Sequence, residues 1–151
     1  MLVETLFFSI KRRDVSNFIQ DNSNDFSELA KQKIAEFNAL HWDASQRQPL
    51  GLKKLNERGE PVVALAGRTF GNWLYVESLW LAESERGLGM GRAILAEAEA
   101  LARGRGCRFV VLDTLDFQAR PFYEKQGYTV QWTQEDYPFA GGAKYFMVKE
   151  L

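Results

Sequence analysis

Hydrophobic and polar positions follow two different spacings along the chain, and each spacing predicts a different kind of element. Residues 3–10 are apolar, are rich in Thr and Phe, and end at a run of charges, which predicts a first strand. Apolar positions then recur three and four residues apart, which predicts a helix over residues 26–40, capped by Asp25 or Ser27. The chain therefore opens with a strand and a helix.

Three strands are expected in the next part of the sequence. Residues 51–56 alternate weakly between apolar and polar, and the turn sequence ERGEP separates them from an apolar arm over residues 61–69. A second turn at Gly71-Asn72 precedes the long apolar segment 73–81. This arrangement predicts a hairpin followed directly by a third strand.

The apolar spacing then changes to that of a helix. From Gly89 onward one face is apolar, and Gly104 and Gly106 end the pattern. The short continuous apolar run at residues 109–112 is typical of a strand covered on both faces. Segment 73–81, the helix and segment 109–112 form a βαβ unit, so the two strands should be parallel and joined by a right-handed crossover.

The carboxyl-terminal part predicts one more helix and one more pair of strands. The helix lies near residues 117–126 and ends at Gly127, and two arms near 128–133 and 144–149 flank a turn-rich loop. We find no repeat, linker or low-complexity segment, so one domain is expected over residues 1–151. The predicted fold class is α/β: a mixed, mostly antiparallel sheet with a central parallel βαβ unit, flanked by helices.

The bulk composition excludes several function classes. The chain has 151 residues and 46% hydrophobic content, and its 19 Lys and Arg are balanced by 20 Asp and Glu, so no basic field favours nucleic acid or anionic lipid. Cys107 is the only cysteine, which excludes an intrachain disulfide and a cysteine-based zinc cluster, and no metal is expected. No apolar run approaches the length of a membrane span, and the first apolar run precedes its charges, the reverse of a secretory signal. We expect a cytoplasmic protein, and the sequence is compatible with a homodimer.

The segment most indicative of chemistry is ERGLGMGRA, residues 85–93, between a predicted strand and a predicted helix. Three glycines let the backbone turn sharply and approach a ligand, and the first N–H groups of the helix have no partners inside it. The helix dipole adds positive charge there, and Arg86 or Arg92 would add a full charge. These features predict a cradle for phosphate groups.

Two other nucleotide-binding motifs fit this turn less well. A P-loop needs Lys and then Ser or Thr after its last glycine, but Gly91 is followed by Arg92 and Ala93. A Rossmann fingerprint would place Arg92 or Ile94 where helix packing needs glycine. Asp113 lies at about the distance expected of a ribose-binding acid, so a small dinucleotide-binding oxidoreductase stays open as an alternative.

Two motifs together resemble the GNAT superfamily of acetyl-CoA-dependent N-acetyltransferases. Residues 86–91, RGLGMG, fit its coenzyme-binding loop, and residues 119–128, ARPFYEKQGY, resemble its second signature in the expected order and spacing. Many members carry asparagine seven residues before the tyrosine of that signature, where this chain has aspartate. The resemblance implies acetyl-CoA as co-substrate and contacts to it from Leu79, Trp80, Leu81, Arg86, Gly87, Leu88, Gly89, Met90, Gly91, Arg92, Asp116 and Phe122.

The resemblance also implies roles for two ionisable side chains. Glu77 is the only charged residue in WLYVESLWL, and burial in a central strand would make it a better proton acceptor at neutral pH, so it is the candidate base. The open alternative is that Glu77 faces a solvated groove or pairs with a basic residue. The resemblance makes Tyr123 the acid that protonates the departing thiolate, while an aromatic packed in the core is the competing interpretation.

The acceptor is expected to be a primary amine of a small molecule or peptide. The family plan places two loops around it, and Trp42, Asp136 and Tyr137 supply acidic and aromatic groups that suit a cationic amine. The same residues would also suit an ordinary surface loop. A non-catalytic acyl-CoA-binding regulatory module remains a second alternative, because it would keep the glycine turn without needing Glu77 or Tyr123.

Overall fold

The computed structural model describes residues 18–151, and the chain divides into one unit ending at Trp42 and a second, Asp43–Leu151. The first unit contains helix α1 (Asn24–Asn38), which confirms the predicted amino-terminal helix. Its cap is Ser23, whose Oγ accepts a hydrogen bond from the Phe26 N–H at 3.1 Å, so the predicted caps Asp25 and Ser27 are wrong. The strand predicted over residues 3–10 lies outside the described residues.

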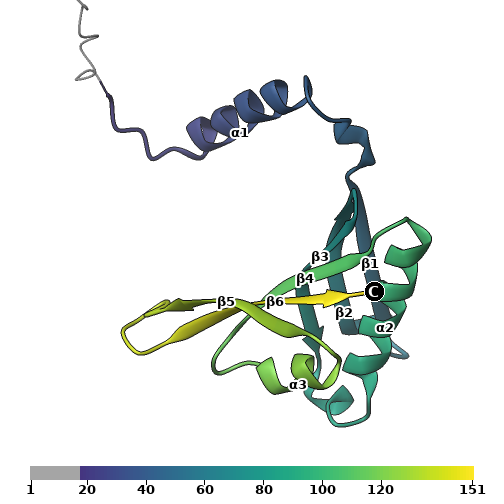
Figure 1. The fold of residues 1–151 in the computed structure, drawn as a ribbon. Helices are drawn as coiled ribbons and strands as arrows, with labels where there is room; N and C mark the ends of the chain where they lie inside the picture. The colour runs from purple at the N-terminus through teal and green to yellow at the C-terminus, as the bar shows by residue number, and fades with distance from the viewer. Residues whose placement is uncertain (1–17) are drawn as a thin grey trace, which may run out of the picture. The chain divides into compact units, whose positions relative to one another are not determined.

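The second unit is built on a six-stranded sheet in the order β1-β2-β3-β4-β6-β5 (Figure 1). Neighbouring strands are antiparallel except β3 and β4, which are parallel and are connected through helix α2. This arrangement confirms the predicted fold class. The strands are β1 (Gln48–Leu55), β2 (Pro61–Phe70), β3 (Trp73–Leu81), β4 (Phe109–Leu115), β5 (Thr129–Glu135) and β6 (Ala143–Glu150).

Helix α2 (Met90–Gly104) packs against β1, β2 and β3 and closes one face of the sheet. Its apolar face is alanine-rich, and Ala98 and Ala102 are fully buried, so the helix backbone approaches the strands closely. Helix α3 (Arg120–Lys125) is shorter than the predicted helix near 117–126. The difference arises because residues 117–119 form a turn, in which the Gln118 side chain accepts a hydrogen bond from the Leu115 N–H at 2.8 Å.

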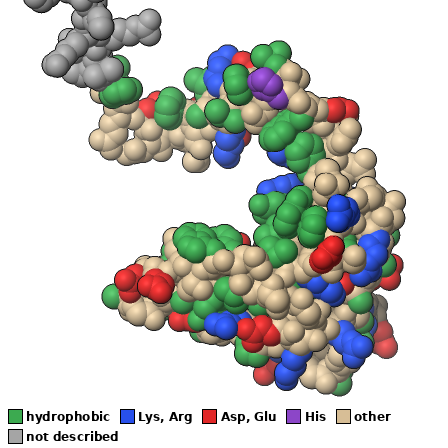
Figure 2. Space-filling model, viewed as in Figure 1, with side chains coloured by type: hydrophobic (Ala, Val, Ile, Leu, Met, Phe, Trp, Pro, Cys, Tyr) green, Lys and Arg blue, Asp and Glu red, His purple; other side chains and the backbone are tan. Residues whose placement is uncertain are grey.

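Strand β4 is covered on one face rather than on two. Val110, Leu112 and Thr114 are buried on the core side, while Asp113, on the opposite face, is exposed. The prediction of a strand covered on both faces is therefore wrong, because α2 lies on one side of the sheet and aromatic side chains form the surface of the other. On that face Trp73 stacks on Phe109 and Trp132 stacks on Phe146. Figure 2 shows groups of hydrophobic side chains at the surface of the molecule.

The parallel strands β3 and β4 pair only near their beginnings. In the described chain, their register joins Trp73–Tyr75 to Phe109–Val111, and β3 continues to Leu81 without pairing to β4. The β2–β3 ladder shifts register at the same place, between Ala66 and Gly67. A Cβ at Gly67 would collide with the Tyr75 carbonyl oxygen, so glycine is required where the strands come this close. The separation of β3 from β4 opens the sheet where the cavities lie.

A buried polar network fixes α2 to the carboxyl-terminal strands. The Glu99 carboxylate is 4% exposed and accepts hydrogen bonds from the Tyr128 hydroxyl at 2.9 Å and the Lys149 ammonium at 2.6 Å. Burial, followed by the neighbouring Glu99 charge, raises the pKa of Tyr128 far above its usual value.

Among the described helices, none has both the length and the apolar character needed to cross a membrane.

Candidate active site

The glycine turn leads directly into the amino terminus of α2. Gly87 and Gly89 have φ values of 73° and 78°, in the left-handed region that favours glycine, and Gly89 is the residue at which the helix begins. A Cβ at either position would meet no atom within 4 Å, so the space above the turn is open. The first turn of α2 carries no acidic residue that would oppose an anion there. The predicted phosphate cradle therefore has a suitable backbone geometry.

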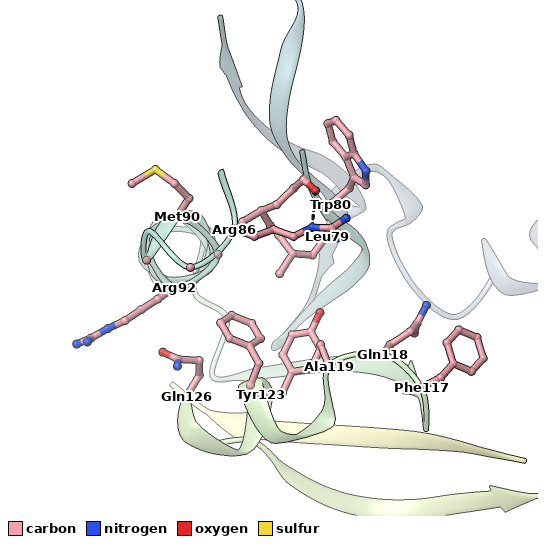
Figure 3. Close-up of a pocket in the computed structure, with 15 residues that line it drawn as sticks. Leu79, Trp80, Arg86, Met90, Arg92, Phe117, Gln118, Ala119, Tyr123 and Gln126 are labelled. Atoms are coloured by element: carbon pink, nitrogen blue, oxygen red, sulfur yellow. Dashed lines mark hydrogen bonds between the residues drawn. The ribbon is translucent and has the colours of Figure 1, made fainter. Parts of the chain in front are cut away.

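A cavity of about 740 Å³ lies between the α2 amino terminus, the end of β3 and helix α3 (Figure 3). This first cavity is within the usual size range of small-molecule sites. It is lined by Leu79, Trp80, Leu81, Arg86, Gly87, Gly89, Met90, Gly91, Arg92, Phe117, Gln118, Ala119, Phe122, Tyr123 and Gln126. The structure thus brings together the glycine turn and the second signature, which are about thirty residues apart in the sequence.

All coenzyme-binding candidates line the first cavity except Leu88 and Asp116. Leu88 is an exposed residue within the turn. The Asp116 carboxylate accepts a hydrogen bond from the Phe117 N–H at 2.8 Å and so shapes the loop after β4. Sequence reasoning missed Phe117, Gln118 and Gln126 as lining residues. Gln126 lies within the second signature and Phe117 and Gln118 directly precede it, and this was their only signal, because no chemical feature of these side chains marks a binding site.

Two packing contacts hold the turn and the signature in place. The Arg86 Nε donates a hydrogen bond to the Leu81 carbonyl oxygen at 3.3 Å, which ties the turn to the end of β3 (Figure 3). A Cβ at Gly91 would lie 3.3 Å from the Phe122 ring, so this glycine lets α2 approach α3 closely. Phe122 therefore has a packing role at the wall of the cavity.

Tyr123 presents its hydroxyl to the first cavity and points toward β3 (Figure 3). The residue is 7% exposed, and its ring packs edge-on against Phe122 at 5.0 Å and Tyr128 at 5.8 Å. Burial, with a smaller contribution from the Asp113 charge, raises the pKa of Tyr123 above its usual value near 10. The hydroxyl thus stays protonated at neutral pH and is available as a proton donor.

A second cavity of about 400 Å³ adjoins the first. Leu79, Gln118, Ala119 and Tyr123 line both cavities, so these residues form the boundary between them. The remaining lining comes from Glu77, Ser78, Asp113, Thr114, Leu115, Tyr137 and Lys144. The two cavities therefore meet where β3 and β4 have separated, and the Tyr123 hydroxyl lies at that junction.

Glu77 lines the second cavity, but its side chain is 44% exposed and pairs with Arg68 of β2. The expectation that Glu77 is buried is therefore wrong. The reason is the alternation of β3: Leu74 and Val76 face the core, so Glu77 lies on the opposite face with Trp73 and Tyr75. The alternative noted from the sequence, a groove-facing Glu77 paired with a basic residue, describes its observed position.

Of the three residues predicted around the acceptor, Asp136 and Tyr137 belong to the second unit and Trp42 to the first. Tyr137 lines the second cavity. Asp136 is not among its lining residues, and its carboxylate accepts a hydrogen bond from the Gly141 N–H at 2.9 Å within the β5–β6 loop. Trp42 ends the first of the two units. Asp113, considered from the sequence as a ribose-binding acid, lies instead in the second cavity and pairs with Lys144 at 2.9 Å.

The combined arrangement suits transfer of a group between two bound molecules. The open glycine turn and the helix dipole fit a phosphorylated ligand in the first cavity. The second cavity is lined by two carboxylates, Glu77 and Asp113, each of which pairs with a basic side chain of the protein. Within residues 18–151, no group of three His, Cys, Asp or Glu side chains is arranged to hold a metal ion. The linings of the two adjoining cavities include a proton donor, Tyr123, and a carboxylate that could accept a proton, Glu77.

Known proteins with similar sequences and structures are acetyltransferases. The family model described as acetyltransferase (GNAT) family matches residues 16–128. A blasticidin-S acetyltransferase from Streptomyces morookaense is 42% identical over 96 residues, which cover 63% of this chain and 70% of that protein. The crystal structure of an acetyltransferase from Bacillus cereus ATCC 14579 is 31% identical with a TM-score of 0.78, covering 89% of this chain and 97% of that one.

A more distant structure shares the fold and was crystallised with a ligand. It is an aminoglycoside 6'-N-acetyltransferase complexed with coenzyme A, which is 15% identical with a TM-score of 0.60 and covers 88% of this chain and 97% of that one. The family model covers both the glycine turn and the second signature, which are the segments that build the first cavity. The chain therefore belongs to the acetyltransferase (GNAT) family and is an acyl-CoA-dependent N-acetyltransferase.

Proposed function

We propose that this chain transfers an acetyl group from acetyl-CoA directly to a primary amine of a small molecule or peptide. The observation that carries this proposal is the junction of the two cavities, which share Leu79, Gln118, Ala119 and Tyr123. A thioester in one cavity and an amine in the other would meet at this boundary without a covalent enzyme intermediate. The described cysteine, Cys107, is buried in the core and burial raises the pKa of its thiol, so it is poorly suited to act as a nucleophile.

The first cavity provides the features that acetyl-CoA requires. The N–H groups at the start of α2 and the open left-handed turn would hold its pyrophosphate, and Arg86 and Arg92 would add positive charge. The end of β3, Leu79–Leu81, pairs with β2 but not with β4, and its edge on the β4 side would offer backbone groups to the pantetheine chain and the thioester carbonyl. Coenzyme A in the distant aminoglycoside acetyltransferase structure supports the same co-substrate.

We assign the two proton transfers to Glu77 and Tyr123. Glu77 would take a proton from the acceptor ammonium, directly or through water, because its exposed carboxylate lines the second cavity. The freed amine would attack the thioester carbonyl carbon, a C–N bond would form, and the C–S bond would break. Tyr123 would give its proton to the departing sulfur and recover one from the nitrogen that has become an amide.

The relatives support a small-molecule acceptor. Two of the acetyltransferases similar to this chain are named for blasticidin-S and for aminoglycosides, and both names denote small molecules. The second cavity, at about 400 Å³, is also of a size that suits a small molecule or a single side chain. We propose Tyr137 as an acceptor contact, and the assignments of Trp42 and Asp136 stay predictions.

The test uses the full chain, acetyl-CoA and a panel of primary amines. Release of free thiol, measured with a thiol-reactive dye, should require both chain and amine, and mass spectrometry should find one acetyl group added to the amine. Binding of acetyl-CoA with no thiol release for any amine would indicate a non-catalytic module instead. Binding of NADH in preference to acetyl-CoA would overturn the assignment of the first cavity.

A further inference from the structure

The second cavity contains an ammonium group that belongs to the protein itself. The Lys144 Nζ lies 2.9 Å from the Asp113 Oδ1, 5.3 Å from the centre of the Tyr137 ring and 5.4 Å from the centre of the Phe146 ring. The Lys144 side chain is 22% exposed. A carboxylate and two aromatic rings therefore surround this one cation.

These partners are the ones that a bound substrate ammonium would use. A carboxylate gives a charge-assisted hydrogen bond, and aromatic faces attract cations within about 6 Å. Because Lys144 already makes both kinds of contact, an acceptor cation that entered this place would meet a like charge and would find Asp113 neutralised. Glu77, on strand β3, is the other carboxylate that lines this cavity; it pairs with Arg68, and its side chain is 44% exposed.

Nothing in the coenzyme-binding arrangement needs this lysine. Lys144 and Asp113 line the second cavity and are not among the residues that line the first. Lys144 lies on β6 and Asp113 on the adjacent strand β4, so the ion pair joins these two strands at the wall of the second cavity. The Lys144–Asp113 pair can therefore affect which acceptors enter the second cavity without changing the glycine turn.

We propose that Lys144 is a specificity-determining residue of this enzyme: its ammonium fills the cation site formed by Asp113, Tyr137 and Phe146, so that acceptors with a single cationic amine are selected over diamines. The inference rests on the proposed function, since it assumes that the second cavity receives the acceptor. Removing the Lys144 side chain should open the site to the second amine of a diamine.

The experiment compares butylamine with diaminobutane, two acceptors that differ by one terminal amine. We measure kcat/KM with acetyl-CoA for the full-length wild type, for Lys144→Ala, and for Lys53→Ala, which controls for the loss of one lysine charge. We expect Lys144→Ala to raise the diaminobutane-to-butylamine ratio about tenfold, mainly through a lower KM for the diamine. Lys53→Ala, on strand β1 and outside both cavities, should leave the ratio unchanged.

Two further variants identify the carboxylate as the source of the effect. In the double variant Lys144→Ala with Asp113→Asn the gain should disappear, because the site that the diamine would occupy has lost its charge. A gain that persists in the double variant, or a ratio unchanged by Lys144→Ala, would overturn the proposal. If Lys144→Ala does not fold, as judged by its thermal transition, Lys144→Ser takes its place with the same expectations.

A binding measurement separates this inference from the proposed function. Calorimetric titration with diaminobutane needs no turnover, and it should show about tenfold tighter binding to Lys144→Ala than to the wild type. Tighter binding without any acetyl transfer would support the cation site and contradict the proposed function. Acetylation of butylamine by the wild type, with equal diamine binding to both proteins, would support the function and refute the role of Lys144.

Discussion

Tyr123 carries the only hydroxyl among the residues shared by the two cavities. We predict that Tyr123→Phe keeps coenzyme affinity but lowers kcat by about tenfold or less, because a thiol of pKa near 8.5 is already a tolerable leaving group. Steady-state kinetics and coenzyme A titration on the same preparations check this. Unchanged kcat would assign Tyr123 to core packing alone.

Glu77, which lines the second cavity, is the residue that we propose as the base. We predict that Glu77→Gln leaves acetyl-CoA affinity near wild type and lowers kcat/KM about 10²-fold at pH 7, since glutamine keeps the size but cannot accept a proton. The deficit should shrink toward about pH 10, where solvent supplies the neutral amine. The measurement is kcat/KM from about pH 6 to 10 for both proteins, and parallel profiles would remove Glu77 from the role of base.

The turn before α2 acts as a unit with the amino terminus of that helix. We predict that Gly89→Asp weakens acetyl-CoA binding at least about tenfold, because a side chain and a negative charge would occupy the open space in front of the helix dipole. Gly59→Asp is a matched control: Gly59 has a φ of 79°, has open space around it, and lies in the β1–β2 turn. Equal affinity of the two folded variants would move the phosphate site elsewhere.

The contact between α2 and β6 depends on the buried Glu99. We predict that Lys149→Met lowers the free energy of unfolding by about 3 kcal/mol, because it leaves a buried carboxylate without its ionic partner. Lys125→Met, at an exposed position in α3, should change it by less than about 0.5 kcal/mol. Urea unfolding of the three proteins provides the values, and equal losses in both variants would contradict the importance of the network.

The whole fold should respond to alkaline pH through two buried tyrosines. Burial raises the pKa of Tyr123 and of Tyr128, so the folded state keeps their protons where the unfolded chain would release them. Their stabilising contribution is complete below the ordinary value of about 10 and is lost as the pH rises above it. We predict that tyrosinate absorbance from these two residues develops together with loss of the folded circular dichroism signal. Tyr128 ionising in the folded protein below about pH 10 would contradict its burial.

The local sequence determined the elements and the family of this protein. Glycine spacing, the change of apolar period and the second signature predicted the turn, helix α2 and the parallel strands β3 and β4, because each of these signals acts over a few residues. The glycine turn and the second signature together resemble known acetyltransferases, and this resemblance predicted that the Gly89 turn lies near Tyr123. The lining of the first cavity, where we propose that the coenzyme binds, was therefore largely predictable from the sequence.

Only the tertiary structure decided which charged side chains line the second cavity. Strand β3 is apolar on both faces apart from Glu77 and Ser78, and such a strand does not show which face is buried. The exposure of Glu77 and its pairing with Arg68 therefore came from the packing of α2 on the other face. The Lys144–Asp113 pair and the Glu99–Lys149 pair join residues 31 and 50 positions apart, and each depends on strand register and helix packing. Local spacing carries no information about such contacts, because they form only when the sheet has assembled.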